Sequence, residues 1–169
     1  MKWLPSWWRA HFLLCEGGVA VALTVAFAWW YLGAAGTVMV NALLESSRHA
    51  IYGTAASVLG SLLGFIITAA SIVFAVSGSD RLKVVRDSSQ YPVLWSVFSA
   101  TIRACGLATI TAFVALIFDR DQKPMPTLLI IAVFGVLLAI LRIARAIWAL
   151  ERVITLITAP RQEERRGES

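Results

Sequence analysis

The sequence predicts an all-α integral membrane protein with four transmembrane helices, both termini in the cytoplasm and a last helix that extends into the cytoplasm. Of its 169 residues, 59% are hydrophobic and 15% are charged, whereas globular domains are about half apolar and about a quarter charged. The apolar residues gather in blocks near or above the roughly 20 residues that cross a hydrocarbon core. The basic residues gather on one side of these blocks, as in multi-pass membrane proteins.

The first predicted helix covers residues 12–34. An uncharged run of 28 residues separates Glu16 from Glu45. Tryptophans flank the helix, with Trp8 near its start and Trp30 near its end, 22 residues later. At about 1.5 Å per residue, this separation of about 33 Å matches one hydrocarbon core. We therefore expect the flanking aromatic residues to mark the two membrane interfaces.

The second predicted helix, residues 50–78, has small side chains for a membrane span. Residues 53–78 carry no charge, and 15 of these 26 residues are Gly, Ala, Ser or Thr. Eight of the small residues recur at intervals of three and four, so at about 100° per residue they fall within roughly 80° of the helix surface. This small-residue stripe comprises Gly53, Ser57, Gly60, Gly64, Thr68, Ser71, Ala75 and Gly78.

The stripe predicts protein or water as its neighbour rather than lipid, because small residues let helix backbones approach closely. Three interpretations fit the pattern: packing inside the four-helix bundle, contact between identical subunits, and the wall of a pore. In a pore, Ser57, Thr68 and Ser71 would supply the hydroxyl groups along the path. The second and third interpretations can hold together in one oligomer.

The third predicted helix, residues 93–118, contains a single charge, Arg103. Ser96, Ser99 and Gly106 lie on the same side of the helix as this arginine. Six small residues lie on the other side and predict a contact with another helix. They are Thr101, Ala104, Cys105, Ala108, Ala112 and Ala115.

The fourth predicted helix, residues 126–158, is longer than a membrane requires. At about 1.5 Å per residue it measures about 50 Å, whereas the hydrocarbon core is about 30 Å thick. We interpret its cytoplasmic end, with Arg145 and Arg152, as a docking surface for a cytosolic protein. A helix resting on anionic headgroups is the alternative. Residues 1–158 should form a single transmembrane domain, and residues 159–169 a disordered polar tail.

Loop charges predict how the helices are oriented. Eleven lysines and arginines lie before the first helix, after the second, or along the end of the last helix and the tail, against three in the opposite connections. Because basic residues are enriched on the cytoplasmic side, both termini are assigned to the cytoplasm. The connections at residues 36–50 and 119–126 are then outer loops, which hold few groups able to bind a ligand.

Three charged residues are predicted to lie within the membrane. Counted from the nearest inner tryptophan at about 1.5 Å per residue, Glu16, Arg103 and Arg142 lie about 9–12 Å inside the interface. We expect Glu16 and Arg103 to be direct neighbours, with Arg142 within reach, because pairing offsets the cost of an intramembrane charge. For the arginines, extension toward lipid phosphate is the alternative.

The sequence contains no catalytic, cofactor-binding or metal-binding pattern. The two histidines, His11 and His49, and the two cysteines, Cys15 and Cys105, lack the spacing of a metal site. Nucleotide-binding and hydrolase motifs are absent from the sequence. We therefore expect no enzyme activity, no cofactor and no metal. Because the basic residues follow the topology rather than a folded patch, we expect no nucleic-acid partner either.

Two functions fit these features. The first is a non-enzymatic, homo-oligomeric membrane protein that forms the membrane-embedded subunit of a larger complex and docks a cytosolic partner. We expect such a protein in a bacterial inner membrane, with a stress or antiviral defence complex as one setting. The alternative is an ion-conducting homo-oligomeric channel or pore lined by the second helix. The partners expected are membrane lipid, further copies of the chain and a cytosolic protein.

Overall fold

The computed structural model describes residues 6–77, 91–119 and 124–158, which form five α-helices and, within these ranges, no strand. The all-α class is confirmed for the described residues, and four of the helices contain stretches long and apolar enough to cross a membrane, as predicted. The predicted helix 126–158 has the observed bounds, and the predicted helices 50–78 and 93–118 agree to within two residues, whereas the helix predicted over 12–34 begins six residues earlier, at Ser6. The helices are α1 (Ser6–Leu32), α2 (Ala34–Leu44), α3 (Arg48–Ser77), α5 (Tyr91–Phe118) and α6 (Pro126–Thr158).

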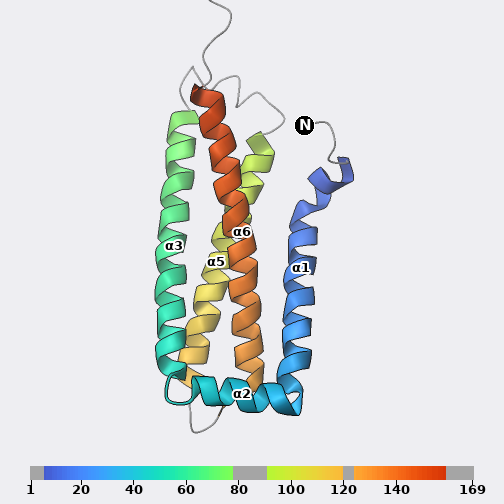
Figure 1. Cartoon of the computed structure of the whole chain (residues 1–169). Helices are drawn as coiled ribbons and strands as arrows, with labels where there is room; N and C mark the ends of the chain where they lie inside the picture. The colour runs from blue at the N-terminus through green and yellow to red at the C-terminus, as the bar shows by residue number, and fades with distance from the viewer. Residues whose placement is uncertain (1–5, 78–90, 120–123, 159–169) are drawn as a thin grey trace, which may run out of the picture.

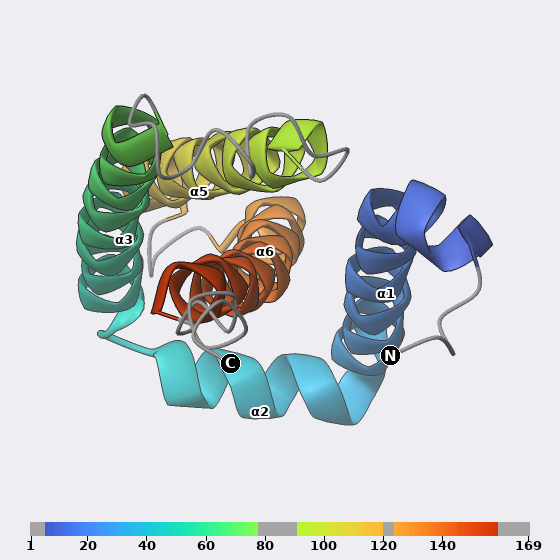
Figure 2. The same cartoon turned by 90° about the horizontal axis from the view of Figure 1, so that it is seen from above.

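The four long helices run side by side, and α2 lies across one end of them (Figure 1). Helix α5 packs against both α3 and α6, and α1 packs against α6. Viewed along the bundle, α1 therefore stands apart from α3 and α5 (Figure 2). We call the end crossed by α2 the α2 end, and the end where α1 begins and α6 finishes the terminal end.

Helix α2 was not predicted, because its segment was assigned to an outer loop. Its 11 residues are too few to cross a membrane, so hydropathy alone could not separate it from the preceding span. The chain leaves α1 through Gly33, which is extended with φ −65° and ψ 146°. Gly36 then lies against the carbonyl of Trp30, where any Cβ would overlap with that carbonyl. The Thr37 hydroxyl donates to the carbonyl of Tyr31 over 2.5 Å, which satisfies a group left open at the end of α1.

The contact that α5 makes through its small residues confirms a prediction. All six residues of the predicted small side are buried. On the side of α6 that faces α5, buried alanines recur at intervals of seven, at Ala132, Ala139 and Ala146. A Cβ built on Gly135 would lie 3.1 Å from Thr111 Oγ1 and 3.2 Å from the Cα of Ala108. The two backbones are therefore close because the side chains between them are small.

Gly135→Ala is expected to destabilise the protein. The added methyl group would meet the backbone of Ala108, which cannot move away as a flexible side chain can. We therefore expect the free energy of unfolding to fall by about 1–3 kcal/mol. Thermal unfolding in detergent measures the change. Gly106→Ala is the matched control, because nothing lies within 4 Å of its built Cβ. The control should be neutral or stabilising, since alanine is the better helix former by about 1 kcal/mol; equal effects would exclude the close α5–α6 contact.

Candidate functional site

The small-residue stripe of α3 lies largely on the outside of the single chain. Ser57, Gly64, Thr68, Ser71 and Ala75 are exposed, and Gly53 and Gly60 are half-buried. Gly78 lies outside the described residues. Packing inside the bundle, one of the three interpretations, therefore accounts for the half-buried Gly53 and Gly60 but not for the five exposed positions.

Larger side chains explain why the stripe faces outward. Leu59, Ile66 and Val73 are buried in the core that α3 shares with α5. These residues occupy the neighbouring face of the helix, so most of the stripe is turned away from α5. Only its edge lies near that helix, where Cβ atoms built on Gly53 and Gly60 would meet Leu116 and Thr109. Periodicity identified the stripe correctly as a distinct face, but it could not identify the neighbour of that face.

The exposed hydroxyl groups of the stripe bond to their own helix. Thr68 Oγ1 donates to the carbonyl of Gly64 over 2.9 Å, and Ser71 Oγ donates to the carbonyl of Ile67 over 2.8 Å. Such bonds use the hydroxyl protons and lower the cost of placing the side chains in apolar surroundings. The oxygen lone pairs remain available to a further partner.

A charged cluster at the terminal-end half of the bundle joins α1 to α6. Glu16 Oε2 lies 3.5 Å from Arg142 Nε, and Arg145 Nε donates to Glu16 Oε1. Arg103 instead donates from Nε to the carbonyl of Ser99, 3.2 Å away. The predicted direct pair of Glu16 with Arg103 is therefore wrong, whereas Arg142 is within reach as expected. The reason is that α1 packs against α6 rather than α5.

The cluster lies within apolar parts of the chain. Glu16, Arg103, Arg142 and Arg145 all fall inside the four candidate spans. The side chain of Glu16 is only 11% exposed, and those of Arg142 and Arg145 are 12% and 23% exposed. Arg145, predicted as a docking residue, is thus engaged by Glu16. The other predicted docking residue, Arg152, lies in the last turns of α6, and its side chain is outside the described residues.

A second charged cluster, at the α2 end, was not predicted. Asp119 Oδ2 accepts hydrogen bonds from Arg48 Nη1 over 3.0 Å and from the Tyr52 hydroxyl over 2.6 Å. The other oxygen, Oδ1, accepts from the backbone N–H of Met125 over 2.7 Å. Arg48 Nη2 in turn donates to Asn41 Oδ1 over 2.5 Å. The carboxylate of Asp119 therefore connects the end of α5 to α3 and to the start of α6, and Arg48 extends the network to α2.

Helix ends account for the placement of this second cluster. Arg48 is the first residue of α3 and Asp119 directly follows the last residue of α5. Each charge has the unfavourable sign for the helix dipole at its own position. Pairing the two offsets both effects, and the side chains are nearly inaccessible, with Arg48 3% and Asp119 1% exposed. The sequence feature that could have indicated this pair is that Arg48 and Asp119 flank the same predicted end of the bundle.

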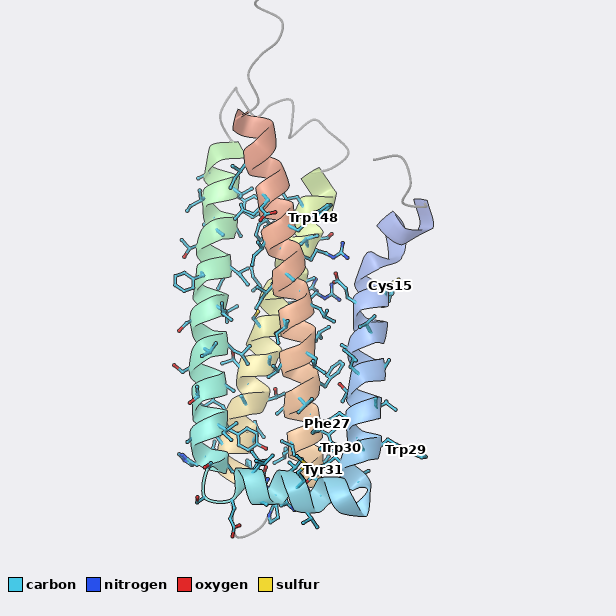
Figure 3. The ribbon with its side chains drawn as sticks, viewed as in Figure 1. Cys15, Phe27, Trp29, Trp30, Tyr31 and Trp148 are labelled. Carbon is cyan, nitrogen blue, oxygen red and sulfur yellow. The ribbon has the colours of Figure 1, made fainter. Side chains whose placement is uncertain are left out.

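Aromatic side chains mark both ends of the bundle. At the α2 end, Phe27 stacks on Tyr31 with ring centroids 5.9 Å apart, while Trp29 points away from the bundle (Figure 3). At the terminal end, Trp95 packs edge-on against Phe74 at 4.5 Å, and Trp148 is exposed on α6 (Figure 3). Amphipathic rings at two levels along an apolar bundle are typical of membrane interfaces.

Four long apolar helices, two internal charged clusters and one uncovered small-residue face are together typical of a helical, multi-pass membrane protein. Comparisons with protein-family models, with curated proteins and with solved structures gave no match. Within the described ranges, no group of three or more histidine, cysteine or acidic residues could hold a metal ion. The case for a function therefore depends on the chain's own surfaces and charges.

Proposed function

We propose that the protein is a non-enzymatic membrane subunit that assembles with identical copies through the α3 stripe and holds a cytosolic protein at the membrane. The membrane is a bacterial inner membrane, and both termini lie in the cytoplasm. The excess of basic residues at the terminal end of the bundle supports this orientation.

The uncovered stripe is the observation that carries the proposal. The chain has small-residue faces on α3, α5 and α6, and those of α5 and α6 are buried. On α3, five stripe positions stay exposed while the larger residues beside them pack inward. Lipid gains little from a row of glycine, serine and threonine, whereas a second helix can approach it closely. A second copy of the chain supplies such a helix without requiring another protein.

The length of α6 supports the docking part of the proposal. The helix runs from Pro126 to Thr158 over 33 residues, about 50 Å at about 1.5 Å per residue, whereas the hydrocarbon core is about 30 Å thick. Its last turns therefore extend beyond the length that a membrane requires. Because Arg145 is engaged by Glu16, docking is assigned to these last turns, with Arg152 among them.

Gly64→Leu tests the assembly. Nothing lies within 4 Å of a Cβ built on Gly64, so the single chain should tolerate the leucine. Between closely packed copies it would cost about 1–3 kcal/mol, which raises the apparent dissociation constant roughly tenfold or more. Mass measurement of the detergent-solubilised protein, by light scattering over a dilution series, reports the change.

The matched control for this test is Gly18→Leu. Gly18 is also helical and exposed, with nothing within 4 Å of its built Cβ, but it lies on α1. The control should keep the mass of the unsubstituted protein. A Gly64→Leu protein of unchanged mass across the dilution series would remove the stripe as the assembly surface.

Ion conduction by this oligomer distinguishes the proposed subunit from the alternative, an ion-conducting pore. Copies assembled around the stripe would direct the outward lone pairs of Thr68 and Ser71 toward a shared axis. Flux from liposomes containing the purified protein measures conduction directly. Ion flux that Thr68→Leu blocks would establish the pore, whereas a silent protein that retains a cytosolic partner during purification supports the subunit.

A further inference from the structure

Arg103 is a charged side chain that does not pair with Glu16. It is exposed, and its Nε donates to the carbonyl of Ser99 within its own helix. In the described part of the chain, its two terminal nitrogens have no hydrogen-bond partner. The residue nevertheless lies inside the candidate span Leu94–Phe118. A guanidinium group at such a level requires a counter-anion or a path to the interface.

The neighbouring helix places a second guanidinium group at the same level. Thr101 Oγ1 donates to the carbonyl of Arg142 over 3.1 Å, which aligns this part of α5 with that residue of α6. Arg142 also interacts electrostatically with Arg103, Arg145 and Glu16. Glu16 contacts Arg142 and Arg145, whereas Arg103 bonds to the carbonyl of Ser99. The positive charge of Arg103 therefore favours an anion from outside the chain.

The side of α5 that carries Arg103 is exposed in the single chain. Helix α1 packs against α6, and no comparable packing joins it to α5 in the described chain. The separation of α1 from α5 is visible along the bundle axis (Figure 2). A lipid headgroup can therefore reach Arg103 laterally, without the chain having to unpack.

We propose that Arg103 binds the phosphate group of an anionic lipid in the leaflet at the terminal end. Guanidinium groups bind phosphate oxygens in a bidentate manner, and basic groups between membrane helices bind anionic headgroups. Trp95 precedes Arg103 by eight residues, about 12 Å along the helix. A long arginine side chain shortens that distance by extending toward the interface. This site is independent of the proposed assembly, because the stripe lies on α3.

Lipid titration of the full-length protein in detergent tests the proposal. Short-chain phosphatidylglycerol is added, with phosphatidylcholine of the same chain length and sodium phosphate as separate arms, and the unfolding temperature is followed. Phosphatidylglycerol should raise this temperature, because a ligand that binds only the folded state stabilises it. The other two arms should not. Stabilisation by sodium phosphate alone would indicate a free-anion site, and equal stabilisation by phosphatidylcholine a nonspecific lipid effect; either overturns the proposal.

Arg103→Gln assigns the site to this residue. The apparent affinity for phosphatidylglycerol should fall roughly tenfold, as for the loss of one charged hydrogen-bonded contact. Without lipid, the variant should be at least as stable as the original protein, because a charge has left an apolar span. Arg161→Gln, which removes the same charge beyond the end of α6, should bind like the original. Unchanged lipid binding in Arg103→Gln, or equal destabilisation with and without lipid, contradicts the proposal.

Discussion

Asp119→Ala is expected to lower the free energy of unfolding by about 3–5 kcal/mol, because it leaves a buried arginine without its counter-charge. Arg48 would keep its bond to Asn41 but lose the carboxylate 3.0 Å away. The Tyr52 hydroxyl and the backbone N–H of Met125 would lose their acceptors in the same change. Unfolding in mild detergent with increasing denaturant measures the loss.

A double-mutant cycle separates this pair from general damage at the α2 end. Arg48→Ala alone should also be strongly destabilising, but Arg48→Ala combined with Asp119→Ala should cost less than the sum of the two. Coupling of about 0.5–3 kcal/mol is typical of residues in one ion-pair network. Glu45→Ala removes an exposed acid three residues before Arg48 and should change little. Strict additivity of the two losses would mean that the pair is not formed.

Glu16→Gln has the second largest expected effect. The carboxylate lies against both Arg142 and Arg145, inside apolar spans. Its removal leaves two guanidinium groups without their shared counter-charge, at about 2.5–3.5 kcal/mol for each fully uncompensated charge. We expect roughly this loss in the free energy of unfolding, and a weaker attachment of α1 to α6, which limited proteolysis would detect.

Second substitutions identify the partner of Glu16. Glu16→Gln combined with Arg142→Gln should recover part of the loss, because the double variant removes one of the stranded charges together with its partner. Glu16→Gln combined with Arg103→Gln should show no coupling between the two changes. If Arg103→Gln rather than Arg142→Gln recovered the lost stability, the result would support the Glu16–Arg103 pair expected from the sequence.

The long helices were predictable because hydropathy is a local property. The lengths of uncharged runs fixed three spans, and the single charge in residues 93–118 did not conceal the fourth. The small side of α5 was also predictable, since its six residues recur with helical periodicity and are all buried. Helix α2 escaped prediction because its apolar residues continue the preceding run, so hydropathy gave no boundary at Gly33.

The ion pairs were not predictable, because they depend on which helices are neighbours. Depth counting placed Glu16, Arg103 and Arg142 correctly at one level. Depth counting gives no information about which helices are neighbours. Because α1 contacts α6 rather than α5, the predicted partner of Glu16 was the wrong arginine. Asp119 was assigned to an outer loop for a similar reason, since nothing local indicates that its carboxylate folds back onto Arg48.

The attachment of α1 at its two ends has a mechanical consequence. At the α2 end, the helix continues into α2, which Asn41 joins to the buried Arg48. At the terminal end, the described polar attachment to α6 is Glu16, 16 residues before Leu32, or about 24 Å away. Helix α1 is thus fixed at its α2 end and can tilt about that end. A tilt of about 10° moves Glu16, about 24 Å away, by about 4 Å. This movement separates the Glu16 carboxylate from both arginines while the attachment at the α2 end stays intact.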